Sequence, residues 1–418
     1  MELKTLLNKV QKHPRFVYDA TRLVEVDGVL QLEVSIRARR GCTPVCSGCY
    51  QKRPGYDRLE TRRFQFVPLW AIAVYFVYAP RRCKCPQCGV KVELLPWSDG
   101  KSSSTTTFAW FLASWAQALS WEQTAKRFNV SWSVVFESVR KAVQWGKAHR
   151  HLDGIHAIGV DEIAWRRGHK YMTLVYQLDA GCRRLLWIGH DRTAKTFGEF
   201  FDWLGPTRTA ALRFVVSDMW KAFLGTVSRR AGHAIHVLGR FHVAKLCNES
   251  LDEVRRAEAR RLREKGDHVT LKHTRWALLK RHVNLNGEQR SRIRQLLKTN
   301  LATVTAYLLK EDLRLFWTYK SPRYAGRFLD GWVVTALASK LDPMIKLGRT
   351  LDDHRELLLN WFRARGELAM GAVEGLNNKA RVTTKIAYGF RTYEHAEIAL
   401  FHRLGKLPEP PWLTHRFA

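Results

Sequence analysis

The chain has 418 residues, 46% of them hydrophobic, so it is too long for one ordinary domain and apolar enough to build a core in each of two or three. Seventy Lys and Arg against 38 Asp and Glu give a formal charge of +32, which favours a polyanionic partner, nucleic acid before any other. A basic membrane-surface protein has the same sign of charge, but neither end of the sequence shows a basic amphipathic helix, and the longest apolar run, residues 67–79, is shorter than the ~20 residues of a membrane span.

The first residues and the cysteines both bear on the compartment. Residues 1–16 alternate charged and apolar side chains and lack the apolar core of a signal peptide, which predicts a cytoplasmic, nucleoid-associated protein. The cytoplasm keeps thiols reduced, so the 8 cysteines are not expected to form disulfides.

Residues 1–98 are predicted to form a zinc-binding β module. They hold β-rich runs at 64–67 and 74–78 and two Cys-x-x-Cys knuckles, each able to give two thiolates to one tetrahedral Zn²⁺. The predicted ligands are Cys46, Cys49, Cys85 and Cys88. Either Cys42 or Cys83 could replace a neighbouring ligand, and a set of free, partly buried thiols is the alternative to a metal site. Four thiolates leave no open coordination position, so the zinc is expected to be structural.

Residues 99–150 are predicted to be a helix-turn-helix DNA-binding domain. A loop rich in Ser and Thr is followed by apolar residues at helical spacing, which indicates three short helices. Ser120 and Gln123 form a capping-box pattern, and Ser131 can cap the next helix, which would enter a major groove. From the pattern alone an ordinary helical hairpin is the alternative. The predicted DNA contacts here are Ser131, Ser133, Arg140 and Lys141.

Residues 151–241 are predicted to be the first part of an α/β domain, because strand-like runs alternate with helical ones. Two of the runs end in an acid, Asp161 after 158–160 and Asp218 after 214–217. One such Asp is commonly a cap or turn residue, but two in one sheet favour a metal site. Phosphodiester cleavage uses two divalent ions, which carboxylates bind well. Glu162 should point to the opposite side of its strand, so it is left out of the site.

The remaining sequence is predicted to be a basic helical insertion, residues 242–370, and a last segment, residues 371–418, that opens with a helix. On that helix Glu374, Asn378, Arg381 and Lys385 recur at steps of four, three and four, so one face can offer a metal ligand beside phosphate-binding cations. A solvated face with Glu–Arg pairing would look similar. The predicted DNA contacts are Arg255, Arg256, Arg260 and Arg261 in the insertion and Asn378, Lys379, Arg381 and Lys385 on the helix.

Several segments of the sequence resemble the ISL3 family of insertion-sequence transposases. They are residues 78–89 (YAPRRCKCPQCG), 159–165 (GVDEIAW), 168–171 (GHKY), 240–245 (RFHVAK), 371–379 (GAVEGLNNK) and 387–390 (AYGF). The likeness covers nearly the whole chain. It implies an α/β ribonuclease-H-like catalytic core with a helical insertion, preceded by the zinc-binding β module and the helix-turn-helix, and it puts the catalytic Asp-Asp-Glu triad on Asp161, Asp218 and Glu374.

The resemblance also implies an activity. It implies a transposase that binds terminal inverted repeats in double-stranded DNA, cleaves with two Mg²⁺ ions per active site, for which Mn²⁺ can substitute, and joins the ends to target DNA. A homodimer or larger assembly on DNA is expected. The family often has an Asp where this chain has Gly239, and His242 either orients groups near the site or is a packed, hydrogen-bonded side chain. The alternatives are an inactive transposase-derived DNA-binding regulator and a structure-specific ribonuclease-H-like nuclease.

Overall fold

The computed structural model of the chain describes residues 3–166, 168, 170–364, 367, 368, 371–387 and 389–413. Of the motif residues quoted above, His169 and Tyr388 lie outside the described residues, as do residues 414–418 of the predicted last domain. Two compact units divide the chain: one runs up to Arg150 and includes the residues from Leu407 onward, and the other runs from His151 to Lys406.

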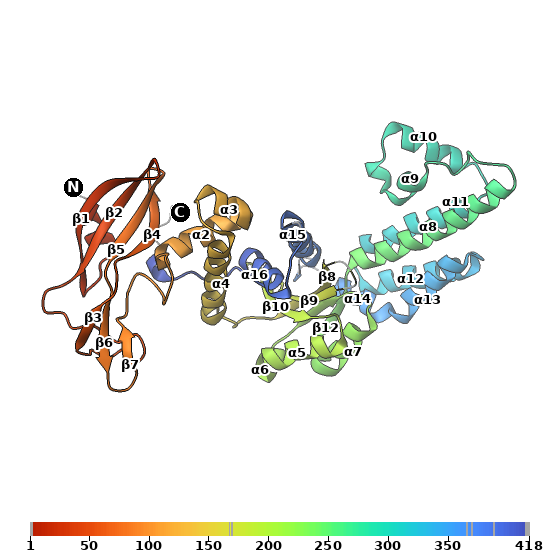
Figure 1. Ribbon diagram of the computed structural model, residues 1–418. Helices are drawn as coiled ribbons and strands as arrows, with labels where there is room; N and C mark the ends of the chain where they lie inside the picture. Colours follow the sequence, from red (N-terminus) through yellow and green to blue (C-terminus); the bar gives the residue numbers. More distant parts are fainter. Residues whose placement is uncertain are drawn as a thin grey trace. The chain divides into compact units, whose positions relative to one another are not determined.

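The first unit is built on two small sheets and an N-terminal helix, α1 (Leu3–Val10) (Figure 1). The larger sheet has the order β1-β2-β5-β4 and consists of β1 (Phe16–Val26), β2 (Val29–Ala38), β4 (Arg62–Leu69) and β5 (Ile72–Tyr78). The smaller has the order β3-β6-β7 and consists of β3 (Gly55–Arg58), β6 (Arg81–Cys85) and β7 (Gly89–Val92). Trp97 is buried at the centre of the aromatic core of the larger sheet, where it packs edge-on against Phe16 and Tyr78.

Three helices follow in the same unit: α2 (Thr106–Ala118), α3 (Trp121–Arg127) and α4 (Trp132–His149). The predicted capping box is confirmed, since the Ser120 hydroxyl accepts from the Gln123 backbone N–H and the Gln123 side chain accepts from the Ser120 N–H. Ser131 caps α4, as expected. Val135, Val139, Ala142 and Val143 form the buried face of α4.

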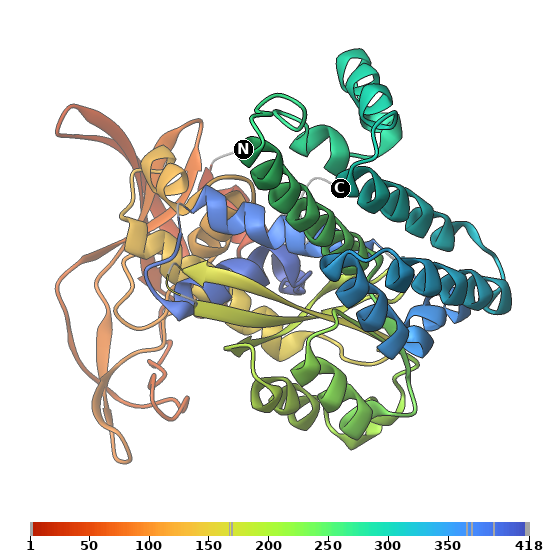
Figure 2. The same ribbon diagram turned by 90° about the vertical axis from the view of Figure 1, so that its right-hand side faces the viewer.

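The second unit contains a five-stranded sheet in the order β10-β9-β8-β11-β12. Its strands are β8 (Ala157–Arg166), β9 (Lys170–Gln177), β10 (Arg184–His190), β11 (Phe214–Ser217) and β12 (Ile235–Leu238). The first three pair antiparallel, while β8, β11 and β12 pair parallel. Helices α5 (Ala194–Leu204), α6 (Pro206–Ala210) and α7 (Lys221–Ala231) lie on one side of the sheet, and α15 (Ala372–Ile386) and α16 (Tyr393–Leu404) on the other (Figure 2).

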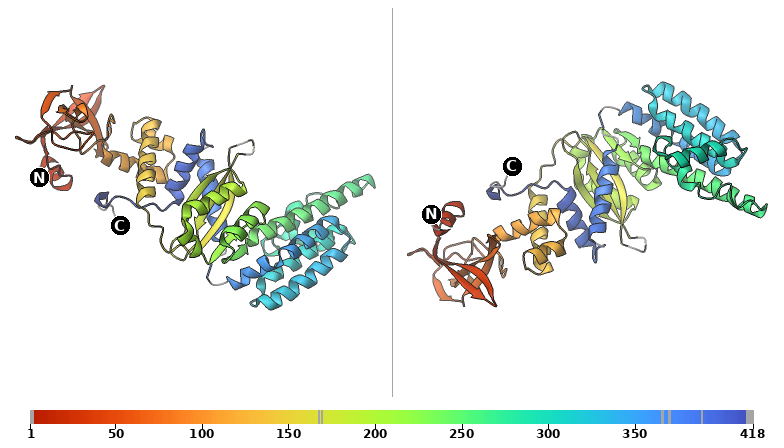
Figure 3. Two further views of the ribbon diagram at one scale, coloured as in Figure 1. Left: turned by 90° about the horizontal axis from the view of Figure 1, so that it is seen from below. Right: turned by 90° about the horizontal axis from the view of Figure 1, so that it is seen from above.

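A largely helical segment separates β12 from α15. It comprises α8 (Arg240–Glu264), α9 (Arg275–Leu279), α10 (Gly287–Leu296), α11 (Ala302–Leu315), α12 (Pro322–Ala338), α13 (Asp342–Asp353) and α14 (Arg355–Arg363). The long helices α8 and α11 run side by side, and α12 and α13 form a second pair next to them (Figure 3). Buried polar contacts hold the helices together: Glu258 of α8 accepts the first backbone N–H groups of α11, and the Lys310 ammonium donates to carbonyls at the end of α9.

No described helix is long and apolar enough to cross a membrane.

Candidate active site and cysteine cluster

The two predicted aspartates lie level with each other on neighbouring strands. Strands β8 and β11 pair in parallel, with Val216 opposite Gly159. Two residues further along the chain come Asp218, directly after β11, and Asp161, in the middle of β8, so the two acids lie level on neighbouring strands about 4.8 Å apart. Asp161 is buried and Asp218 half-buried. The expectation that the first strand ends at Asp161 is wrong, because β8 continues to Arg166. A buried acid within a strand is costly unless the surrounding groups compensate it.

Helix α15 packs against β8 because Gly159 has no side chain. A Cβ atom at this position would lie 2.5 Å from Val373 Cγ2 on α15 and 3.0 Å from Leu178 Cδ1. Gly159 and Asp161 are two residues apart on one strand, so they face the same side of the sheet. The glycine therefore brings α15 close to the face on which the Asp161 carboxylate lies.

A buried chain of hydrogen bonds links α15 to Asp161. The Tyr176 hydroxyl of β9 donates to Asn377 Oδ1 at 2.7 Å, and Asn377 Nδ2 donates to Asp161 Oδ2. The other carboxylate oxygen, Oδ1, accepts the Glu162 backbone N–H at 2.7 Å. Because the tyrosine hydroxyl occupies the amide oxygen, the amide nitrogen is directed at Asp161. Asn377 was not among the residues predicted from sequence, although it lies on the buried face of α15 with Leu376 and Ala380.

The surroundings of Asp161 shift its pKa in opposite directions. Burial raises the pKa of Asp161 and the negative charge of Asp218 raises it further, whereas His242, the Glu162 N–H and Arg381 lower it. His242, on the first turn of α8, holds its Nε2 3.8 Å from Asp161 Oδ2. Glu162 forms a separate ion pair with Arg192 at 3.0 Å. Four separate chain segments therefore supply the charged groups at this place, namely Asp161, Asp218, His242 and Arg381.

Glu374 lies in the first turn of α15, three residues before Asn377, and is exposed. The predicted polar stripe is also exposed, since Asn378, Arg381 and Lys385 are all open to solvent. Within the described part of the chain, the four knuckle cysteines are the one group of three or more His, Cys, Asp or Glu residues whose ligand atoms all lie within 4.8 Å of one another. The carboxylates of Asp161, Asp218 and Glu374 are thus spaced more widely than a closed metal site requires.

The predicted DNA-contact residues have different surroundings. Arg140 pairs with Glu137, Lys141 pairs with Asp99 at 3.2 Å, and both cations are half-buried. Ser131 is occupied as a helix cap, while Ser133 is exposed. In α8, Arg255 is largely buried against Asp252 at 2.8 Å. The predicted contacts that are exposed on α8 and α15 are Arg256, Arg260, Arg261, Asn378, Lys379, Arg381 and Lys385.

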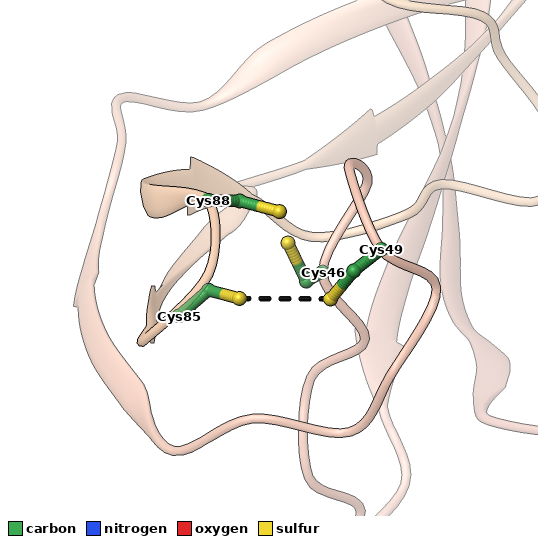
Figure 4. Close-up of side chains that lie close together, drawn as sticks. All are labelled: Cys46, Cys49, Cys85 and Cys88. Carbon is green, nitrogen blue, oxygen red and sulfur yellow. Dashed lines mark hydrogen bonds between the residues drawn. The ribbon is translucent and has the colours of Figure 1, made fainter.

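The four predicted zinc ligands come together beside the smaller sheet of the first unit, where only Cys85 belongs to one of its strands (Figure 4). Their sulfur atoms all lie within 4.8 Å of one another, and Cys49 Sγ is 3.5 Å from Cys85 Sγ. Cys83 is buried nearby, but its thiol donates to the Lys91 carbonyl at 3.4 Å, and it is not part of the cluster. The structure therefore groups the two knuckles without Cys42 or Cys83.

Local hydrogen bonds favour thiolates in this cluster. Backbone N–H groups of Cys49 and Gly48 lower the pKa of Cys46. Burial acts to raise the pKa of Cys85, but the backbone N–H groups of Cys88 and Gln87 outweigh it and lower the value to about 6. The Arg53 guanidinium lies 3.8 Å from Cys49 Sγ and 3.2 Å from Gln87 Oε1, so it bridges the two knuckles. The thiolate, which is the zinc-binding form, is therefore favoured at Cys46 and Cys85, whereas burial and hydrogen bonds with the other thiols raise the pKa of Cys88 to about 12.

Comparisons with known proteins identify the family of the chain. Residues 158–400 match the ISL3 family of DDE transposases, whose description reads "Transposase". The transposase for insertion sequence element IS1001 from Bordetella parapertussis is 28% identical over 354 residues, which cover 84% of this chain and 86% of that protein. The transposase for insertion sequence element IS1557 from Mycobacterium tuberculosis is 29% identical over 387 residues, which cover 85% of each protein.

The fold and these matches define the class of protein: the chain is an insertion-sequence transposase. It belongs to the ISL3 family of DDE transposases, because the family match covers more than half of its length. This confirms the family predicted from the sequence motifs.

Proposed function

We propose that this transposase cuts DNA at the ends of its insertion sequence and joins those ends to target DNA, with Asp161, Asp218 and Glu374 as the catalytic acids. The observation that carries the proposal is the parallel pairing of β8 with β11, which sets Asp161 level with Asp218 beside the helix that carries Glu374. Terminal inverted repeats and target DNA are the proposed substrates, and two copies of the chain would be needed to hold two ends.

The donor set fits a hard divalent cation. Carboxylate oxygens are the ligands that Mg²⁺ prefers, and Mn²⁺ accepts the same set. When bound, two such ions would stabilise the attacking and leaving oxygens of the phosphodiester. Burial and, to a smaller extent, the negative charge of Asp218 raise the pKa of Asp161, and a bound cation would offset both effects. Asn377 would hold Asp161 in place, while Glu374 at the exposed start of α15 would close the site.

Two finer assignments of fold belong to this proposal. A ribonuclease-H-like core is supported by the five-stranded sheet, in which the first three strands form an antiparallel meander and the last two run parallel to β8. A helix-turn-helix is supported by α3 and α4, whose caps and tight connection are those of the motif. Ser133 and the adjoining exposed turn would then face DNA.

A structural zinc in the first unit completes the proposal. Zinc–sulfur bonds of about 2.3 Å in a tetrahedron put the sulfur atoms about 3.8 Å apart. The observed cluster, with all four sulfurs within 4.8 Å and one pair at 3.5 Å, fits that spacing. Cys46, Cys49, Cys85 and Cys88 would hold the ion and so fix the smaller sheet.

Cleavage of a labelled duplex that carries one insertion-sequence end tests the catalytic assignment. Asp161→Asn, Asp218→Asn and Glu374→Gln should each reduce cleavage to background in Mg²⁺ while the protein still binds the duplex. Glu162→Gln is the matched control, because Glu162 adjoins Asp161 yet pairs with Arg192. Cleavage by any of the three triad variants at the parental rate would show that the acid in question is not catalytic.

A further inference from the structure

A groove of about 530 Å³ runs along one face of α8. Its α8 wall extends from Phe241 to Arg256, a separation of 15 positions (256 minus 241) or about 22 Å of helix. Arg275 and Leu279 of α9 form the opposite wall. The mouth of the groove adjoins the candidate active site, because Phe241 directly precedes His242, whose Nε2 is 3.8 Å from Asp161.

Asp252 at the floor of the groove gathers three arginines. Its buried carboxylate lies 2.8 Å from Arg255, 3.3 Å from Arg275 and 3.6 Å from Arg256. One carboxylate cannot neutralise three guanidinium groups. Arg255 is largely buried, but the side chains of Arg256 and Arg275 are 66% and 51% exposed, so most of their N–H donors stay open to solvent. The groove therefore contains two arginines that are held in position and still carry uncompensated charge.

The mouth of the groove is also rich in positive charge. Burial lowers the pKa of Arg240, and the nearby positive charges of Arg281 and Arg314 lower it further, so like charges are crowded there. Phe241 is an exposed aromatic side chain at this end, and the exposed Trp276 carries the Arg275 guanidinium 5.0 Å from its ring centroid. Exposed aromatic rings among cations offer flat faces to sugars and bases while the cations bind phosphates.

We propose that this groove between α8 and α9 holds the backbone of a DNA strand next to the scissile phosphate. The inference rests on the proposed function, since DNA cut at Asp161 passes the mouth of the groove. Along the axis of a duplex each strand rises 3.4 Å per nucleotide, so 22 Å of α8 laid along that axis spans about six nucleotides. Asp252 orients Arg256 and Arg275 before DNA arrives, which reduces the entropy lost on binding and suits bidentate contacts with phosphate oxygens.

The double variant Arg256→Ala/Arg275→Ala tests the groove. Asp252 would keep Arg255 as a partner, so the buried charge stays compensated, and unchanged thermal denaturation would verify the fold. The dissociation constant for an insertion-sequence end is measured against salt concentration. Loss of two phosphate contacts should weaken binding by about tenfold or more at moderate salt and lower the slope of log K against log salt by about 1.8, at 0.9 per phosphate. Lys346→Ala/Arg349→Ala, which removes two exposed cations from α13, is the charge-matched control.

Replacing single DNA phosphates with neutral methylphosphonates locates the contact. Within about six nucleotides of the cut, one or two substitutions should weaken binding by the parent and the control but not by the groove variant. A groove variant with the parental salt slope, or with the parental sensitivity at every position, would overturn the proposal. Failure of the proposed function has a different signature: Asp161→Asn would then cleave normally, whatever the groove binds.

Discussion

Replacing Asn377 with alanine tests whether DNA cleavage depends on how the Asp161 carboxylate is positioned, because all three acids remain present in this variant. The substitution removes the amide that donates to Asp161 Oδ2 and leaves the Tyr176 hydroxyl without its acceptor. A hydrogen bond to a charged group contributes about 1.5–3 kcal/mol, which corresponds to a rate about 10- to 150-fold lower if the whole contribution acts in the reacting state. Tyr176→Phe removes only a neutral bond that orients the amide, so its effect should be about 2- to 10-fold.

Single-turnover cleavage over a range of Mg²⁺ concentrations distinguishes positioning from a general structural defect. Partners that orient a metal ligand typically change metal affinity about 10- to 100-fold, so the Mg²⁺ concentration for half-maximal rate should rise in Asn377→Ala. Val382→Ala alters an exposed residue of the same helix and should leave both quantities unchanged. Cleavage by Asn377→Ala within about threefold of the parent, at the parental Mg²⁺ requirement, would refute the positioning role.

Three further outcomes follow from the structure. Purified protein should contain one zinc per chain by atomic absorption, which Cys85→Ser should lose and Cys83→Ser should retain, because Cys83 lies outside the sulfur cluster. The pKa of Asp161 is raised in the folded state, so without divalent ions the folded state loses stability as the pH rises from 3.8 through the raised value. In chelator-free buffer without divalent ions, Asp161→Asn should therefore be more stable than the parent at pH 7 in urea titrations. This advantage should vanish below pH 3.8. Trp70 and Ala71 both have positive φ in the turn between β4 and β5, a conformation that glycine adopts without strain. Ala71→Gly should therefore raise the free energy of unfolding of the first unit by about 1 kcal/mol. A lower urea midpoint for this variant would show that the backbone at Ala71 is not strained.

Local signals in the sequence were enough to predict several elements of the fold. Ser120 and Gln123 specify a helix start through bonds to their own neighbours, so the capping box could be predicted without tertiary contacts. The apolar runs before Asp161 and Asp218 likewise predict two strands correctly, although only β11 ends at its acid, while β8 continues past Asp161 to Arg166. The clustering of the four knuckle sulfurs could also be predicted, because Cys-x-x-Cys spacing already limits which sulfurs can meet.

Contacts between distant segments could not be predicted from such signals. Asn377 meets Asp161 across 216 positions of sequence, and a polar residue on the buried face of a helix gives no indication of its partner. In α8 the arginines have the same spacing pattern whether they are buried or exposed. Only the fold shows that Arg255 is held against Asp252 while Arg256 stays open.

The motif Gly159-Val160-Asp161 can now be understood as one packing unit. Gly159 admits Val373 of α15 to a distance that any side chain would forbid, and Asp161, two residues on, receives the amide of Asn377 from the same helix. The close approach and the hydrogen bond reinforce each other, because the amide can reach the carboxylate only when the helix lies against the strand. Glu374 shares that helix, so its distance from the two aspartates depends on the same contact. The separation of the three acids is therefore set by the packing of α15 on β8 as much as by the acids themselves.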